Sequence, residues 1–253
     1  MAIPFRHALV TGGGSGVGRA VALALAGEGV AVTVCGRRTG PLMETAAQNA
    51  RIHALAADVT DEGSVAALYE EATAARGAFD IVVANAGMAR SAPAAKTTPD
   101  LWAETLAVNL TGAFLSVRPA MDTMRKAGGG RIVFIASTAG LKGYPYVAAY
   151  VAAKHGVVGL MRALAAEFAT TGITVNAVCP GFADTAMLEE SVARIAATTG
   201  RSPHEARAAL AAANPQGRFI QPQEVAGAVL WLCGADAGSI TGQAISVSGG
   251  ETW

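Results

Sequence analysis

The sequence lacks an excess of charge of either sign. Nineteen Lys and Arg residues balance nineteen Asp and Glu residues, and charged residues make up only 15% of the 253-residue chain. Proteins that bind nucleic acid electrostatically carry a basic excess, and binding to a membrane surface needs a basic patch. The balance therefore argues against both partners. At 52% hydrophobic residues, the chain is also too apolar for a disordered protein.

Cysteines, metal-ligand patterns and long apolar runs are scarce. The three cysteines, Cys35, Cys179 and Cys233, are far apart and form no CxxC pair, so we expect neither a disulfide framework nor a zinc site. The four histidines show no ligand spacing, and we expect no metal. No apolar run reaches the roughly 18 residues of a membrane span. The first residues do not resemble a signal peptide, so the cytoplasm is the expected location.

Short apolar runs that end in glycine or polar turns alternate with helical patterns along the whole chain. Seven such runs lie around residues 8, 32, 55, 82, 133, 175 and 245. Strands alternating with helices predict βαβ units and a parallel sheet. We therefore expect one Rossmann-like α/β domain over residues 1–253, a doubly wound parallel seven-stranded sheet with helices on both faces. Ligands of such folds bind at the carboxyl ends of the strands.

Two regions depart from short, regular alternation. Asp100–Met124 has the pattern of one long helix, and Tyr150–Thr170 that of another. Residues 182–214 contain no strand but two short helical patterns, the second starting at Ser202-Pro203 with Glu205 completing a capping box. An insertion after a strand's carboxyl end is a candidate substrate lid. A packed structural insertion is the alternative.

A glycine-rich loop joins the first predicted strand to the first helix. Its pattern is Thr11-Gly12-x-x-x-Gly16-x-Gly18, with Ser15 and Val17 between the glycines. Glycine permits a tight turn and a close approach of backbone to ligand. The helix N-terminus that follows favours a pyrophosphate. The position after a strand and before a helix predicts a dinucleotide site, and no Walker lysine follows.

The end of the second predicted strand carries arginines and no carboxylate. The segment is Cys35-Gly36-Arg37-Arg38. An acidic residue here would bind the adenosine ribose of NAD, whereas guanidinium groups bind a 2′-phosphate. The segment therefore favours NADP(H) as the cofactor, with NAD(H) as the second choice. A solvated basic turn is the structural alternative.

A tyrosine and a lysine stand four residues apart, at Tyr150 and Lys154. On a helix they share one face. A neighbouring positive charge stabilises phenolate, so we expect the pKa of Tyr150 to be lowered and the phenol to act as a general acid/base. Ser137 follows the strand pattern Arg131–Ala136 and could bind a substrate carbonyl oxygen.

Taken together, these motifs resemble those of the short-chain dehydrogenase/reductase family. The resemblance runs from the first predicted strand to the last, and its closest form is the branch of 3-oxoacyl-thioester and polyketide ketoreductases. The branch is indicated by Lys154–Gly159, Asn176–Gly181 and Pro215–Pro222. The motifs that carry the family resemblance are the glycine loop, Asp58-Val59, Asn85-Ala86-Gly87, Asn109, Ser137, Tyr150-x-x-x-Lys154, and Pro180-Gly181 with Thr185.

The resemblance implies a role for each matching residue. Tyr150 would protonate a ketone oxygen or deprotonate an alcohol, Lys154 would lower the pKa of Tyr150 and bind the nicotinamide ribose, and Ser137 would hold the substrate oxygen. Asn109 would position a water next to Lys154. Asp58 and Thr185 also suit helix caps. The implied cofactor contacts are made by Gly12, Ser15, Gly16, Val17, Gly18, Arg37, Arg38, Asp58, Val59, Asn85, Ala86, Gly87, Tyr150, Lys154, Pro180, Gly181 and Thr185.

We therefore expect an NADPH-dependent oxidoreductase that interconverts a carbonyl and a secondary alcohol, with a 3-oxoacyl thioester or related ketone as substrate. An NAD-dependent secondary-alcohol or 3-hydroxyacyl dehydrogenase is the alternative, and a non-catalytic cofactor-binding sensor is a more remote one. The resemblance also implies a homotetramer packed through the two long helices. Binding of an acyl carrier protein would need a basic entrance, for which Arg125, Lys126 and Arg131 are candidates, although a solvated surface explains them equally.

Overall fold

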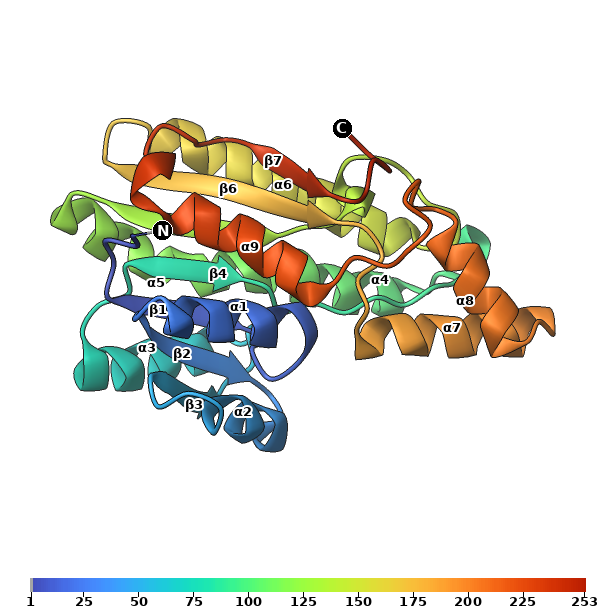
Figure 1. The fold of residues 1–253 in the computed structure, drawn as a ribbon, viewed down its shortest axis with the longest axis horizontal. Coiled ribbons are helices and arrows are strands. Elements are labelled where there is room, and N and C mark those ends of the chain that lie inside the picture. The colour runs from blue at the N-terminus through green and yellow to red at the C-terminus, as the bar shows by residue number, and fades with distance from the viewer. Residues whose placement is uncertain (1) are drawn as a thin grey trace.

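The centre of the molecule is a seven-stranded sheet in which every neighbouring pair of strands is parallel (Figure 1). The computed structural model describes residues 2–253. The strand order is β3-β2-β1-β4-β5-β6-β7, so the direction of winding reverses between β1 and β4. The strands are β1 (His7–Thr11), β2 (Ala31–Gly36), β3 (Ile52–Ala56), β4 (Ile81–Ala84), β5 (Gly130–Ile135), β6 (Ile173–Pro180) and β7 (Ala244–Val247).

The central strands β1, β4, β5 and β6 are buried along their whole length because helices cover both faces of the sheet, and most of their residues are apolar. Ala8, Leu9 and Val10 of β1 are completely buried. Each fully buried Leu or Val side chain contributes about 1.5–3 kcal/mol to folding. This two-sided burial explains why the strands appear in the sequence as continuous apolar runs rather than alternating ones.

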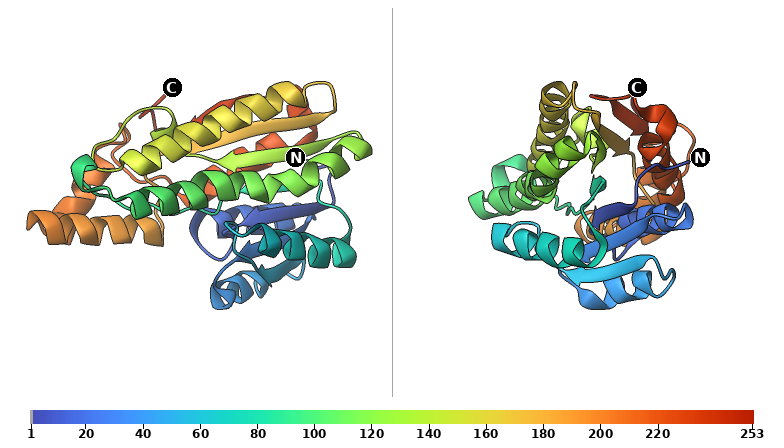
Figure 2. Two further views of the ribbon diagram at one scale, coloured as in Figure 1. Left: turned by 180° about the vertical axis from the view of Figure 1, so that it is seen from behind. Right: turned by 90° about the vertical axis from the view of Figure 1, so that its left-hand side faces the viewer.

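Two layers of helices enclose the sheet (Figure 2). Helices α1, α2 and α9 pack on one face, where Leu25, Val34 and Val229 belong to one buried cluster. Helices α3, α5 and α6 pack on the other, where Val117 and Val157 meet the strands. No helix within residues 2–253 is both long and apolar enough to cross a membrane. The helices are α1 (Gly16–Gly27), α2 (Thr39–Ala46), α3 (Glu62–Arg76), α4 (Pro99–Leu106), α5 (Gly112–Ala127), α6 (Ala148–Glu167), α7 (Ala186–Thr199), α8 (Pro203–Ala211) and α9 (Pro222–Cys233).

The single long helix expected over Asp100–Met124 is interrupted. A π-helical segment, η2 (Ala107–Thr111), separates α4 from α5 and contains the buried Asn109. The Asn109 Nδ2 donates to the Thr105 carbonyl at 2.9 Å. This side-chain bond competes with the helical backbone bonds and accompanies the wider turn. The poor helix former at this position is thus the point where the helix changes geometry.

The insertion between β6 and α9 contains the two predicted helices, α7 and α8, which project from the carboxyl edge of the sheet (Figure 1). Its two ends meet in a parallel bridge between Ala183 and Ile220. The predicted capping box is present, since Glu205 N donates to Ser202 Oγ and Ser202 N donates to Glu205. The insertion is therefore a helical hairpin that leaves and rejoins the fold at one place.

Arg131 is not part of a basic entrance. It is only 6% exposed, and its guanidinium lies 4.8 Å from the centre of the Phe5 ring. Arg125 and Lys126 are exposed, but they end α5 just before β5 begins. All three residues therefore lie towards the amino edge of the sheet, opposite to the edge where ligands bind.

Candidate active site at the carboxyl edge of the sheet

The glycine loop between β1 and α1 has three positions, Gly12, Gly16 and Gly18, that disfavour any larger residue. Gly12 and Gly16 have φ angles of 66° and 52°, and a Cβ on Gly18 would lie 2.4 Å from the Gly12 carbonyl oxygen. Ser15 is the N-cap of α1 but makes no side-chain capping bond. The first N–H groups of α1 therefore remain available to an anion. Val17 packs against the core beneath the loop.

The end of β4 is tied to the end of β1 at the point where the winding reverses. The Thr11 hydroxyl accepts hydrogen bonds from the backbone N–H groups of Asn85 at 3.0 Å and Ala86 at 2.9 Å. The Asn85 side-chain amide donates to the Thr11 carbonyl at 2.8 Å. These bonds bring the predicted Asn85-Ala86-Gly87 segment against the glycine loop.

Ser137, Tyr150 and Lys154 come together beside the ends of β5 and β6. Ser137 is the N-cap of the short helix η3 (Thr138–Gly140), and its hydroxyl is close enough to the phenol of Tyr150, in the first turn of α6, to influence the pKa of that phenol. Lys154 lies one turn further along α6 and is almost completely buried. Its Nζ donates to the Ile135 carbonyl at 2.8 Å and lies 5.7 Å from the centre of the Tyr150 ring.

The electrostatics of this group differ from the sequence-based expectation in one respect. Burial raises the pKa of Tyr150, and the hydrogen bond from Ser137 opposes that shift only in part. Burial also lowers the pKa of Lys154 to about 8. The expected lowering of the Tyr150 pKa by Lys154 is therefore wrong for this arrangement. Removal from water disfavours the charged form of both groups.

Asn109 lies next to Lys154. Its Nδ2 uses both hydrogens, on the carbonyls of Met88 and Thr105, and its Oδ1 accepts from the Met88 N–H at 3.2 Å. A Cβ on Gly87 would lie 2.9 Å from Asn109 Oδ1 and 3.8 Å from Lys154 Nζ. Both atoms therefore border the same small space, and Oδ1 keeps one lone pair for a further donor.

Arg37 and Arg38 are exposed after the end of β2. Neither guanidinium forms a salt bridge within residues 2–253. The Asp58 carboxylate accepts from the Thr60 N–H at 2.9 Å and the Thr60 hydroxyl at 2.7 Å, and these bonds, with a smaller contribution from Arg37, lower its pKa. The structure thus places Arg37 and Asp58 near one another.

Neither Asp58 nor Thr185 caps a helix with its side chain, although the sequence allows that role for both. Asp61, not Asp58, caps α3 by accepting from two backbone N–H groups. Thr185 occupies the N-cap position of α7, but its hydroxyl makes no capping bond. Val59 is buried and packs against Gly112, where a Cβ would lie 2.8 Å from Val59 Cγ2.

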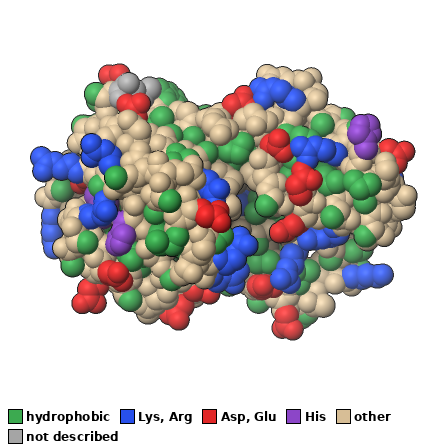
Figure 3. Space-filling view, turned by 60° about the horizontal axis from the view of Figure 1, so that its bottom comes forward, with side chains coloured by type: hydrophobic (Ala, Val, Ile, Leu, Met, Phe, Trp, Pro, Cys, Tyr) green, Lys and Arg blue, Asp and Glu red, His purple; other side chains and the backbone are tan. Residues whose placement is uncertain are grey.

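The start of the insertion lies directly over the glycine loop. A Cβ on Gly16 would lie 3.0 Å from the Thr185 methyl group. Pro180 ends β6, and Gly181 follows it towards Thr185. Figure 3 shows the surface hollowed between the part of the molecule that holds β1–β3 and the part that holds α7 and α8, with Lys and Arg side chains beside the hollow.

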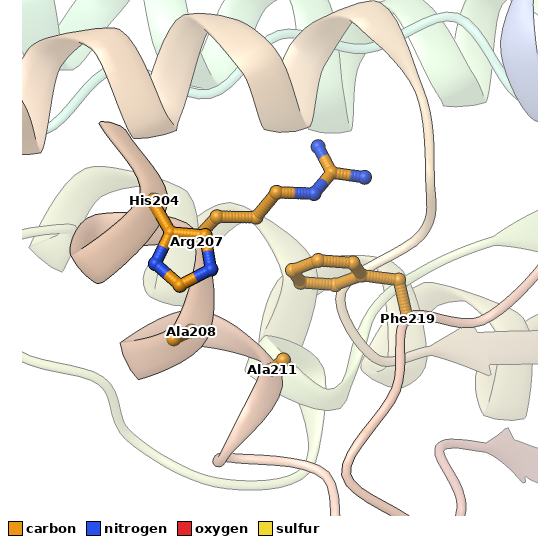
Figure 4. Close-up of a pocket in the computed structure, with 5 residues that line it drawn as sticks. All are labelled: His204, Arg207, Ala208, Ala211 and Phe219. Carbon is orange, nitrogen blue, oxygen red and sulfur yellow. The ribbon is translucent and has the colours of Figure 1, made fainter. Parts of the chain in front are cut away.

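Arg207 fastens the helical hairpin to its own base. Its guanidinium pairs with Asp184 at 2.8 Å and with Glu189, and it stacks 4.8 Å from the centre of the Phe219 ring. Figure 4 shows Arg207 and Phe219 facing each other in a cavity of about 230 Å³. This cavity belongs to the hairpin and contains none of the candidate catalytic residues. It is lined by His204, Arg207, Ala208, Ala211 and Phe219.

Comparison with known proteins decides the family. The sequence profile described as short chain dehydrogenase matches residues 6–196. That span contains the glycine loop, Asn85–Gly87 and the group of Ser137, Tyr150 and Lys154. The chain is a short-chain dehydrogenase. The resemblance seen in the sequence is thereby confirmed, together with the Rossmann-like α/β fold and the assignment as an oxidoreductase acting on carbonyl and alcohol groups.

Relatives of this short-chain dehydrogenase match it over nearly its full length. A putative ketoacyl reductase of Streptomyces coelicolor is 40% identical over 249 residues, 96% of this chain and 95% of the relative. A cis-4-hydroxycyclohexanecarboxylate dehydrogenase of Sinomonas cyclohexanicum is also 40% identical, over 98% and 96% of the two chains. A single-substitution variant of actinorhodin polyketide ketoreductase, solved with NADPH, superposes with a TM-score of 0.95 at 38% identity and 99% coverage of both chains.

Arg19 of this short-chain dehydrogenase supports the glycine loop, and the sequence analysis did not predict this role. The Arg19 guanidinium donates to the Gly14 carbonyl at 2.6 Å and to the Thr45 hydroxyl at 3.0 Å, and it pairs with Glu44 at 3.0 Å. Arg19 thus ties the glycine loop to α2. An arginine on the first turn of a helix carries no local signal for such a contact.

Proposed function

We propose that this short-chain dehydrogenase reduces a ketone with NADPH, and that its substrate is a 3-oxoacyl thioester or a related ketone. The observation that carries the proposal is the grouping of the half-buried Tyr150 with Ser137 and the buried Lys154, whose Nζ lies 5.7 Å from the centre of the Tyr150 ring. In this assignment Ser137 holds the ketone oxygen and Tyr150 donates a proton to it. Lys154 supplies positive charge, and Asn109 holds a water beside Lys154.

The protonation state of the phenol suits the proposed role. A pKa raised above the ordinary tyrosine value keeps Tyr150 protonated at neutral pH. A protonated phenol can donate to a carbonyl oxygen during reduction, and in alcohol oxidation the same group would act as phenolate and accept the proton.

The cofactor proposal rests on the carboxyl edges of β1 and β2. The glycine loop and the uncapped α1 suit a pyrophosphate, and the exposed Arg37 and Arg38 suit a 2′-phosphate. NADP(H) is preferred, with NAD(H) as the alternative. Asp58, Val59, Asn85–Gly87, Pro180, Gly181 and Thr185 would complete the contacts. When bound, NADPH supplies the hydride.

The substrate class is supported by the ketoreductase relatives. We assign the walls of the substrate site to the segment between Ser137 and Tyr150 and to the α7–α8 hairpin, which would act as a substrate lid. We also propose that the protein is a homotetramer packed through α4–α5 and α6, and that it lies in the cytoplasm.

Arg125, Lys126 and Arg131, the basic residues considered for binding a carrier protein, lie at the opposite edge of the sheet, so a carrier protein is not proposed.

An NAD-dependent secondary-alcohol or 3-hydroxyacyl dehydrogenase is the second candidate, favoured by the relative named as a hydroxycyclohexanecarboxylate dehydrogenase. A cofactor sensor without turnover is disfavoured, because binding alone does not require a half-buried phenol next to a buried ammonium.

The deciding assay follows absorbance of the reduced cofactor with acetoacetyl-CoA and simple ketones, each with NADPH and with NADH. NADPH-preferring reduction of the thioester supports the proposal. Activity only on simple ketones, or only with NADH, contradicts its substrate or its cofactor.

The pH dependence of reduction should report Lys154. Its pKa of about 8 means that the ammonium is charged below pH 8 and loses its proton above it, while Tyr150 stays protonated. Reductive kcat/KM, which reports free-enzyme groups, should be level up to about pH 8 and then fall about tenfold per pH unit. In Lys154→Met the rate should be low and the break near pH 8 absent. An unchanged alkaline break in that variant would remove Lys154 from this role.

A further inference from the structure

A buried carboxylate near the candidate active site has no part in the reaction described so far. Glu251 follows β7, and only 1% of its side chain is exposed. Its Oε1 accepts from the Tyr144 hydroxyl at 2.5 Å and lies 3.2 Å from Lys142 Nζ. Its Oε2 has no hydrogen-bond partner within residues 2–253. An unsatisfied buried oxygen is costly, so its retention calls for a compensating role.

The hydrogen bonds around Tyr144 have a defined direction. The Tyr144 hydroxyl lies 2.7 Å from the Thr138 hydroxyl as well as 2.5 Å from Glu251. A phenol has one proton, and a carboxylate can only accept. Tyr144 therefore donates to Glu251 and accepts from Thr138. The result is a chain of hydrogen bonds from Thr138 through Tyr144 to Glu251.

This chain connects the catalytic segment to the start of the lid. Thr138 directly follows Ser137 in the chain and is the second residue of the segment that leads to Tyr150. The Tyr144 ring meets the Phe182 ring edge-on at 6.3 Å. Burial and the bond to Glu251 both raise the pKa of Tyr144, which keeps it a hydrogen-bond donor.

Gly181 completes the arrangement on the other side of the carboxylate. A Cβ on Gly181 would lie 3.0 Å from Glu251 Oε2. Glu251 therefore fills the space beside Gly181 at the end of β6. From there it holds two side chains, Lys142 and Tyr144, of the segment that joins Ser137 to Tyr150.

We propose that Glu251 is a positioning residue for carbonyl reduction. It accepts a hydrogen bond from Tyr144, which in turn accepts one from Thr138. These bonds hold segment 137–144, and therefore Ser137, in the geometry that catalysis by Tyr150 requires. The kinetic consequence rests on the proposed function, whereas the hold on the segment does not. Ser137, which we assign to hold the ketone oxygen, begins the stretch of chain that ends at Tyr150, the assigned proton donor. Small misplacements of such groups lower rates by up to about a hundredfold.

The test compares Glu251→Leu, which removes the acceptor at similar size, with Glu251→Gln, which keeps an acceptor and loses the charge. Glu251→Leu should lower kcat at least about tenfold, with the KM for ketone and the Kd for NADPH within about twofold of wild type. Glu251→Gln should retain about a third or more of wild-type kcat. Tyr144→Phe should match Glu251→Leu, and the double variant should be no worse than either, because both remove one connection.

A readout without turnover accompanies the kinetics. Hydrogen exchange of the amides in segment 138–144 should be at least about fivefold faster in Glu251→Leu and Tyr144→Phe, and unchanged elsewhere. The matched control is Glu71→Gln, which alters an exposed carboxylate on α3, outside the candidate site. It should behave as wild type.

Three results would overturn the proposal: wild-type kcat in Glu251→Leu, additive losses in the double variant, or faster exchange spread over the whole protein. The proposed function is judged separately by the wild-type enzyme. If wild type reduces no ketone in the panel, that function fails, and exchange alone then decides on Glu251. Faster exchange confined to segment 138–144 would support its positioning role, and unchanged exchange would refute it.

Discussion

Replacing Tyr150 with phenylalanine is expected to abolish reduction while leaving NADPH affinity near the wild-type value. The substitution removes one oxygen from a half-buried residue and keeps the packing of its ring. That oxygen carries the proton that we assign to the ketone, and it lies close enough to Ser137 for the Ser137 hydroxyl to influence its pKa. General acid catalysis contributes about 10²–10⁴-fold, so kcat should fall by about a thousandfold.

The control is Glu71→Gln, which alters an exposed carboxylate on α3, outside the candidate site. It should leave both kcat and cofactor affinity unchanged. Steady-state kinetics and a fluorescence titration with NADPH measure the two quantities separately. Retained turnover in Tyr150→Phe would remove Tyr150 from the acid/base role. A parallel loss of NADPH binding would instead indicate a disturbed site.

Replacing both Arg37 and Arg38 with alanine should weaken the preference for NADPH over NADH. Each exposed guanidinium is assigned a charge-assisted contact with the 2′-phosphate. Such contacts at exposed positions are worth about tenfold each in affinity, so the Kd for NADPH should rise about a hundredfold. NADH has no 2′-phosphate, and its Kd should stay within about threefold. The single variants apportion the effect between the two arginines.

Arg51→Ala is the matched control for this experiment. Arg51 is exposed and immediately precedes β3, so it lies at the amino end of that strand, away from the ligand edge. Its removal should leave both affinities unchanged. Because the contacts are electrostatic, the NADPH effect should also shrink at high salt. Equal losses of NADPH and NADH affinity in the double variant would contradict the 2′-phosphate assignment.

Asn109 and Arg131 show where reading the sequence alone reaches its limit. Helical periodicity runs through Asn109 without a break, yet its side-chain bond to Thr105 accompanies a π-helical turn. An arginine is usually exposed, and the sequence therefore suggests a surface charge at Arg131. Its position at the start of a buried strand, over the Phe5 ring, removes it from the surface. In both cases a side-chain contact, Asn109 with Thr105 or Arg131 with Phe5, gives a structure that the local sequence pattern does not predict.

The order of strands and helices, the glycine loop and the pairing of Tyr150 with Lys154 can all be predicted from the sequence. They follow from periodicity and from spacing within one element, which are local properties of the chain. Other features arise only in the folded molecule: the direction of the Tyr150 pKa shift, the contact of Arg19 with Thr45 that ties the glycine loop to α2, and the contact of Glu251 with Tyr144. Each depends on burial or on distances between residues far apart in the chain. Desolvation and long-range hydrogen bonds exist only once the chain has folded.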